Sequence, residues 1–214
     1  MATGTLAAHK SNTSGTFNVY TVPTGKTTEA TVSVVNHSGV SATVVLYVSP
    51  TNSPTDIHTI QVDTLNTANY GYERVPLILK AGEVVSYSTT TSGVDVIVSG
   101  IEYASASNEI KVQQLITTNT ETVIYDNSVA KAGTVNVCVS IVSNLIADEC
   151  FVEMYVSTSD ATNGYKILQQ KLQRTGVTGI EKAGLPISST DKIILVTTNI
   201  VGSVATRVAG YTKG

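Results

Sequence analysis

The three histidines, His9, His37 and His58, are the side chains best suited to proton transfer near neutral pH. A serine nucleophile in a Gly-x-Ser-x-Gly motif would turn such a base into a hydrolase site, but the sequence contains no such motif. We expect His9 near the amino terminus, His37 in a turn and His58 in a strand, each as an exposed polar residue. The sequence therefore predicts a protein that is not an enzyme.

Neighbouring carboxylates are the second candidate for chemistry, either as general acid and base or as ligands of a cation. Asp148 and Glu149 are adjacent, and adjacent residues of a strand point to opposite faces. Asp160 with Asn163 supplies fewer oxygen ligands than calcium requires. We therefore expect no metal site and no cofactor.

The two cysteines, Cys138 and Cys150, lie on either side of Asn144, where we expect a hairpin turn. One interpretation is a disulfide between two antiparallel strands, which requires Cβ atoms about 3.8 Å apart. The other is a pair of small buried thiols. The sequence leaves both open, and the absence of a Cys-x-x-Cys pair argues against zinc.

An internal repeat organises the chain that must position these residues. The segment ATVVLYVS from Ala42 matches CFVEMYVS from Cys150, so that Val44–Ser49 corresponds to Val152–Ser157 at a spacing of 108 positions. Tyr103 and Tyr211 have the same spacing. The repeat predicts a first copy at 1–104, a linker at 105–110 and a second copy at 111–214.

Alternation of apolar and polar residues predicts strands and their buried faces. In the matched segments the inward set is Val44, Leu46 and Val48 in the first copy and Val152, Met154 and Val156 in the second. Val45 is replaced by Glu153, which marks an outward position because burial of a lone carboxylate is costly.

Each copy contains seven or eight short strand patterns. They lie at about 5–10, 16–22, 28–36, 41–49, 56–63, 73–79, 83–91 and 94–102 in the first copy, and at about 111–116, 121–126, 134–143, 150–157, 164–172, 179–187, 191–198 and 203–211 in the second. This pattern predicts an all-β protein of two tandem antiparallel β-sandwich domains, jelly-roll or immunoglobulin-like, related by internal duplication.

Charge and hydropathy indicate which classes of partner the chain is not expected to bind. Charged residues are only 14% of the chain and the net charge is −3, so nothing in the sequence predicts attraction to nucleic acid. No window approaches the ~20 apolar residues of a membrane span. The amino-terminal residues lack the pattern of a signal peptide, which predicts synthesis in a cytoplasm.

Four segments of the first copy carry a resemblance to a known group: Tyr20–Lys26, Asn36–Gly39, Leu79–Glu83 and Val98–Glu102. Copy one resembles a module that recurs in virion structural proteins of tailed bacteriophages, in tail, fibre and decoration components. Copy two departs from it after Tyr125, where no Pro-Thr-Gly-Lys follows. The resemblance implies a β-sandwich building block of a phage particle, located in the virion.

Tyrosine is the enriched aromatic residue, with ten Tyr, two Phe and no Trp. Exposed tyrosines suit interfaces, and we expect contacts at Tyr47, Tyr155, Tyr70, Tyr72 and Tyr87. The expected partners are other virion proteins and further copies of the chain. The alternative is an attachment module that binds a receptor or a host surface glycan; a depolymerase is disfavoured because no acid pair stands out.

Overall fold

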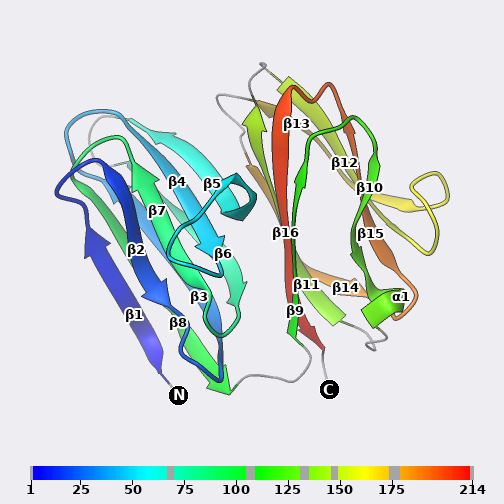
Figure 1. The fold of residues 1–214 in the computed structure, drawn as a ribbon, viewed down its shortest axis with the longest axis horizontal. Helices are drawn as coiled ribbons and strands as arrows, with labels where there is room; N and C mark the ends of the chain where they lie inside the picture. Colours follow the sequence, from blue (N-terminus) through cyan, green and yellow to red (C-terminus); the bar gives the residue numbers. More distant parts are fainter. Residues whose placement is uncertain are drawn as a thin grey trace. The chain divides into compact units, whose positions relative to one another are not determined.

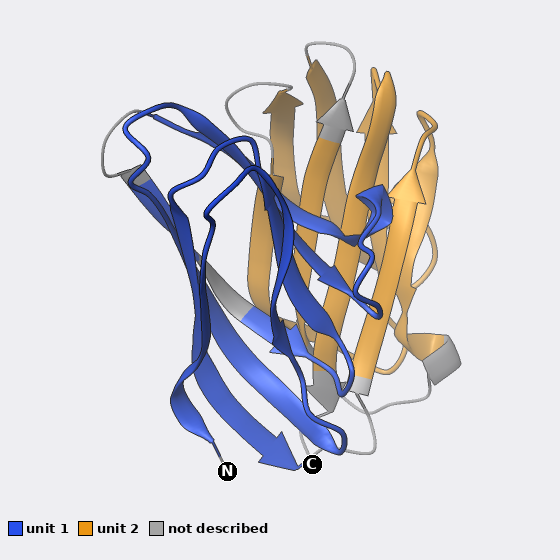
Figure 2. Ribbon diagram, turned by 60° about the vertical axis from the view of Figure 1, so that its left-hand side comes forward, with its two compact units in different colours: residues 1–107 blue, residues 108–214 orange. Residues whose placement is uncertain are grey.

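The computed structural model describes residues 2–66, 70–104, 109–130, 135–145, 149–173 and 179–212. The chain divides into two compact units, Met1–Ser107 and Asn108–Gly214 (Figure 2). Most of the predicted linker, 105–108, lies outside the described residues, whereas Glu109 and Ile110 belong to the first strand of unit 2.

Unit 1 is a two-layer jelly roll with strand orders β1-β8-β3-β6 and β2-β7-β4-β5 (Figure 1). All of its neighbouring strands are antiparallel. The elements are β1 (Thr3–Lys10), β2 (Gly15–Thr21), β3 (Lys26–Asn36), β4 (Ala42–Ser49), η1 (Asp56–His58), β5 (Thr59–Leu65), β6 (Tyr70–Leu79), β7 (Val84–Thr89) and β8 (Val94–Ala104).

Unit 2 has the same architecture, with strand orders β9-β16-β11-β14 and β10-β15-β12-β13. The elements are β9 (Glu109–Ile116), β10 (Glu121–Asp126), α1 (Asn127–Ala130), β11 (Val135–Leu145), β12 (Glu149–Ser157), β13 (Tyr165–Gln173), β14 (Gly179–Ile187), β15 (Lys192–Thr198) and β16 (Gly202–Thr212). Counting along each unit, every strand occupies the same place in both. Within the described residues, no helix is long and apolar enough to cross a membrane.

The predicted alternation in the matched strands is confirmed. Val44, Leu46 and Val48 of β4 are fully buried, as are Val152 and Met154 of β12. Val156 is partly buried and packs against the core of unit 2. Because side chains alternate across a strand, the residues between them face outward from each sandwich.

The sheet edges depart from simple alternation. The four pairings between inner strands have a continuous register. Seven edge strands, β1, β2, β5, β6, β10, β13 and β14, carry a β-bulge, with the extra residue always on the edge strand. Five bulges insert a single aliphatic residue that belongs to or packs against the core of its unit: Leu6, Val19, Ile60, Ile124 and Ile167.

Three bulges occupy matching places in the two units. The extra residue precedes a buried tyrosine in β2 and β10, Tyr20 and Tyr125 respectively. It is an isoleucine in β5 and β13, and it lies immediately before Leu77 in β6 and Leu185 in β14. These shared irregularities favour the predicted duplication, which itself stays a prediction.

Two sequence-based expectations are corrected. Asp56–His58 forms a 3-10 turn before β5 rather than part of a strand. The hairpin expected at Asn144 does not form, because β11 and β12 belong to opposite sheets; β3 and β4, on either side of Asn36–Gly39, do so too.

The bulge at Ile124 generates a test. Ile124 is fully buried, whereas its neighbour Val123 is 38% exposed. We expect Ile124→Ala to lower the free energy of unfolding of unit 2 by about 2 to 5 kcal/mol, because it removes core volume. The matched control Val123→Ala should change it by about 0.5 kcal/mol. Urea denaturation followed by circular dichroism measures both, and equal effects would contradict a core role for the bulge.

Candidate functional site

The predicted contact residues Tyr47 and Tyr155 occupy matching positions on outward-facing sides of β4 and β12. Both side chains are half-buried. The Tyr47 hydroxyl lies 3.3 Å from the Ser88 hydroxyl on the neighbouring strand. Around Tyr47 the outward residues of β4 are uncharged, Thr43 and Val45. The surroundings of Tyr155 are different.

Tyr155 belongs to an ionic cluster on the outer face of the β10-β15-β12-β13 sheet. Its hydroxyl donates a hydrogen bond of 2.7 Å to Glu153 Oε2. Lys166 Nζ of β13 lies 2.6 Å from Glu153 Oε1 and 5.5 Å from the centre of the Tyr155 ring. The cluster places an aromatic ring against an ion pair at the protein surface.

The charges in this cluster influence one another. The hydrogen bond from Lys166, followed by that from Tyr155, lowers the pKa of Glu153. The hydrogen bond to Glu153 raises the pKa of Tyr155, and the same carboxylate raises the pKa of Lys166. Glu153 and Lys166 therefore stay ionised through the neutral range, as a fixed ion pair rather than a proton-transfer couple.

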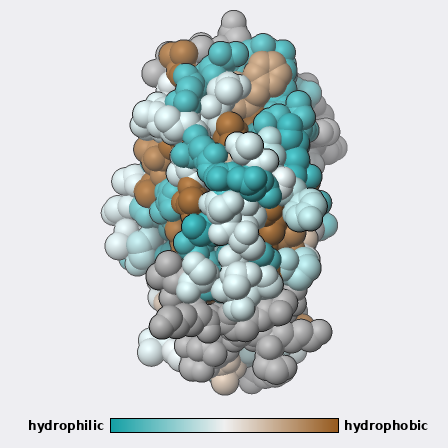
Figure 3. Space-filling view, turned by 90° about the vertical axis from the view of Figure 1, so that its right-hand side faces the viewer, coloured by the Kyte–Doolittle hydropathy of each residue, from teal (hydrophilic) through white to brown (hydrophobic). Residues whose placement is uncertain are grey.

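The outer face of β12 and β13 carries a second aromatic and ionic group, centred four residues along β12 from Tyr155. Phe151 is 38% exposed, and Lys171 Nζ lies 5.9 Å from its ring centre. Lys171 is also paired with Glu149. Figure 3 shows that hydrophobic patches on one side of the molecule are small and separated by hydrophilic residues. We call this outward-facing group the β12–β13 face. It consists of Glu149, Phe151, Glu153, Tyr155, Lys166 and Lys171.

The sequence reasoning found part of this face, because alternation from Val152 places Phe151, Glu153 and Tyr155 on the same outward side. The contribution of Lys166 and Lys171 could not be predicted, because it depends on β13 being the neighbour of β12. Tyr165 was also missed, although it is 81% exposed and follows the Asn163-Gly164 turn.

Tyr87 is not a surface residue, contrary to the expectation. It is fully buried because it belongs to the inward set of β7. Burial raises the pKa of its hydroxyl, which accepts or donates a hydrogen bond of 2.8 Å with His9 Nδ1. Tyr72 is partly buried and packs against the core of unit 1. Tyr70 begins β6, and its side chain lies outside the described residues.

Each histidine makes a local packing, ion-pair or turn contact. His9 is half-buried rather than exposed, and its ring stacks on Phe17 with centroids 4.8 Å apart. His37 lies in the turn after β3 and pairs with Asp95 at 3.1 Å. His58 lies in the 3-10 turn, where its Nδ1 accepts a 3.0 Å hydrogen bond from the Thr55 amide. None of these contacts joins a histidine to a serine or cysteine nucleophile among the described residues.

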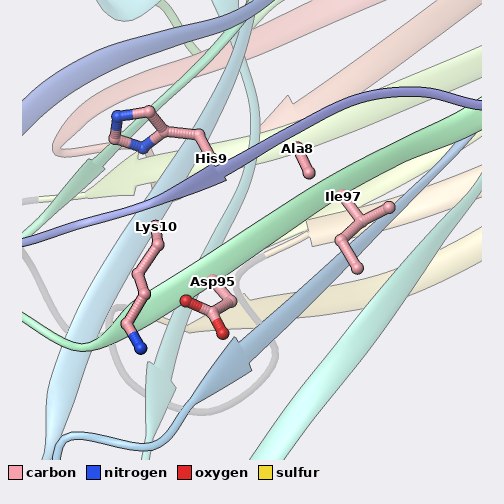
Figure 4. A pocket seen from close by; sticks show the side chains of 5 residues that line it. All are labelled: Ala8, His9, Lys10, Asp95 and Ile97. Carbon is pink, nitrogen blue, oxygen red and sulfur yellow. The ribbon is translucent and has the colours of Figure 1, made fainter.

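A shallow hollow lies beside β1, lined by Ala8, His9, Lys10, Asp95 and Ile97 (Figure 4). Its volume is about 290 Å³ and it is open to solvent. Lys10 and Asp95 lie opposite each other in the register of β1 and β8. The hollow marks where the small side chain of Ala8 leaves space between larger neighbours, and it holds no converging set of reactive groups.

The cysteines are two free buried thiols. Cys150 belongs to the core of unit 2, and burial raises its pKa to about 11. Cys138 lies on β11, in the opposite sheet. The expected arrangement across a hairpin is therefore wrong, and the buried-thiol interpretation is confirmed.

The carboxylates provide no cation site among the described residues. Glu149 is paired with Lys171, while Asp148 lies outside the described residues. Asp160 accepts hydrogen bonds of 2.9 Å from the Asn163 amide and side chain. No group of three or more potential metal ligands occurs in the described ranges.

The fold defines a tandem pair of eight-stranded jelly-roll units. No family model matches the sequence, and no curated protein matches it. Solved structures that are similar include empty cowpea mosaic virus particles, with 9% identity over 99% of this chain and 90% of that chain and a TM-score of 0.32.

Two further similar structures come from different kinds of protein. One describes the triple jelly-roll fold and turret assembly of an archaeal virus, with 14% identity over 95% of this chain and 58% of that chain and a TM-score of 0.31. The other is a fucolectin from striped bass serum, with 10% identity over 97% and 85% and a TM-score of 0.30. At these scores the similarities assign no function.

The Glu153–Lys166 pair generates a pH test. A lowered pKa means that the pair contributes stability above the ordinary pKa of Glu153, 4.5. This contribution is lost as the pH falls through the lower pKa of the folded state. Glu153→Gln should therefore flatten the fall of unfolding temperature between about pH 5 and about pH 3.

Lys166→Gln should flatten that fall to a lesser extent, because the hydrogen bond from Tyr155 still lowers the pKa of Glu153. The double variant should behave like Glu153→Gln, since without the carboxylate Lys166 has no ion pair to contribute. Calorimetry across the pH series measures all three variants. Additive effects would show that the two residues act independently.

The buried thiols generate a chemical test. In the native protein at about pH 8, a disulfide reagent such as Ellman's should react with neither cysteine, because the thiolate is the reactive form and both groups are shielded. In guanidinium chloride both thiols should react promptly. Rapid reaction of the native protein, or failure of the denatured protein to release two thiols, would contradict this assignment.

Proposed function

We propose that this chain is a non-catalytic structural protein of a bacteriophage virion, built from a duplicated jelly-roll unit. The strand order carries this proposal: both units arrange eight strands as two four-stranded sheets in the jelly-roll order. Jelly rolls recur in viral capsid proteins and in lectins. The resemblance of copy one to modules of phage tail, fibre and decoration proteins favours the virion.

The surfaces support assembly by protein–protein contact. Outward-facing Tyr47 and the β12–β13 face present aromatic rings beside polar groups, the composition that interfaces favour. Rings held by cation–π contacts and hydrogen bonds lose little freedom on binding. The proposed partners are other virion proteins and further copies of this chain, in the tail, baseplate, neck or capsid decoration.

The proposed site chemistry is contact rather than catalysis. The Glu153 carboxylate is held as an ion pair, and the Cys150 thiol is protonated at neutral pH by burial. A sparsely charged chain of net charge −3 supports partners other than nucleic acid. The proposal includes no cofactor and no membrane.

The experiment is deletion of the gene from a phage that carries it. Quantitative mass spectrometry of purified wild-type particles should find the chain in a fixed ratio to the major capsid protein. Particles from the deletion should lose a discrete feature in electron micrographs, and a wild-type copy supplied in trans should restore it. The proposal is contradicted if the chain is absent from purified particles and the deletion particles look the same as wild-type particles.

A second candidate is an attachment module that binds a receptor or a host surface glycan. The exposed rings of Phe151 and Tyr165 favour it, because aromatic rings can stack on sugars. Purified protein should then bind a glycan array or host cells, and Phe151→Ala should reduce that binding. Val201→Ala, which alters another exposed apolar residue, provides the matched control. Failure to bind any glycan or cell removes this candidate.

A further inference from the structure

The two sheets of each unit end in strands that have one strand neighbour each. An edge strand exposes backbone donors and acceptors that can pair with another chain, and natural proteins interrupt such edges with bulges or proline. In this protein the β-bulges lie on the edge strands. Seven of the eight edge strands have a bulge, whereas the four pairings between inner strands have none.

Strand β9 is the exception. It ends the β9-β16-β11-β14 sheet and pairs with β16 from Glu109 to Ile116 without a register shift. Its sequence, EIKVQQLI, contains neither glycine nor proline. By contrast, β6 and β14, at the opposite edges of the corresponding sheets, contain Pro76 and Pro186 in addition to their bulges.

The matching strand of unit 1 shows what an interrupted edge looks like. Strand β1 is bulged at Leu6 and contains Gly4 with a positive φ of 100°. Such a bulge bends a strand and breaks the spacing of its hydrogen-bonding groups. The same place in the two sandwiches is thus interrupted in one unit and regular in the other.

We infer that β9 is an assembly edge that pairs antiparallel with β9 of a second copy of this chain. Two β9-β16-β11-β14 sheets would then join into one continuous sheet about a two-fold axis. Main-chain hydrogen bonds would provide most of the affinity, as in other cases of strand addition. This inference rests on sheet order and register and is independent of a location in a virion.

The residues of β9 favour a second copy as the occupant. The strand carries one acidic and one basic residue, so two copies meet without net charge. A two-fold pairing centred on Val112 places Ile110 opposite Gln114 and Lys111 opposite Gln113 of the second copy. No like charges are then directly opposed, whereas a pairing centred on Lys111 would oppose two ammonium groups, which is destabilising.

The first test is the mass of the purified full-length chain in sedimentation experiments over a range of concentrations. We expect a reversible monomer–dimer equilibrium. Val112→Cys should then form a disulfide-linked dimer under mild oxidation, because the two copies of this position are opposed at the axis. Ala8→Cys on the bulged edge β1 is the matched control and should stay monomeric under the same conditions, since both native cysteines are buried.

The second test blocks the edge. Adjacent residues of a strand direct their N–H groups to opposite sides, so one of Val112→Pro and Gln113→Pro blocks the free edge while sparing the ladder to β16. That variant should keep the wild-type thermal transition and weaken dimerisation about tenfold or more.

A wild-type chain that stays monomeric up to about 100 μM, where a weak dimer would be detected, overturns the inference. So does a dimer that both proline variants leave intact. If both proline variants fail to fold, the cross-linking comparison between positions 112 and 8 decides. The virion proposal fails by a separate result, the absence of the chain from purified particles.

Discussion

The structure depends on how a small sandwich ends its sheets. Each sheet buries one face against its partner, and this burial supplies most of the stability. Each sheet must also stop at two strands whose outer backbone groups have no strand neighbour within the unit. The bulges serve both core burial and the ending of the sheet. An extra residue such as Ile60 or Ile124 adds an apolar side chain to the core and also disrupts the regular hydrogen-bonding edge.

Alternation allowed the inner strands to be predicted from the sequence, since β4 and β12 keep a strict period of two. The all-β class and most strand positions follow from such segments. The edge strands were also located, but their bulges were not predicted. A bulge puts two successive residues on one face, as with Ile124 and Tyr125, so the period of two is lost there. Sheet membership was also beyond reach, because a short connection such as Asn36–Gly39 can join strands of one sheet or of two. The misplacement of Cys138 and Cys150 followed from that ambiguity.

Tyr87 and Tyr155 show why the site was predicted only in part. Both are tyrosines in strands with alternating patterns, and only the phase of the alternation separates buried from outward-facing. The repeat provided that phase for Tyr155, because Val45 corresponds to Glu153, but no comparable substitution marked β7. The ion pairs of the β12–β13 face depend on neighbours across strands. Such contacts follow from register, which local sequence specifies weakly at a bulged edge.

Two sandwiches with one strand order can differ most freely where the core does not constrain them, at their outer faces and at their edges. Unit 2 differs from unit 1 in both places. Its β12 face carries charges where β4 has none, and its β9 edge is regular where β1 is bulged. A face selects a partner through side chains, which gives specificity, whereas an edge binds through the backbone, which any extended strand can supply. An open edge in one unit alone limits pairing to a closed two-fold assembly, because a second open edge on the same chain would permit endless addition.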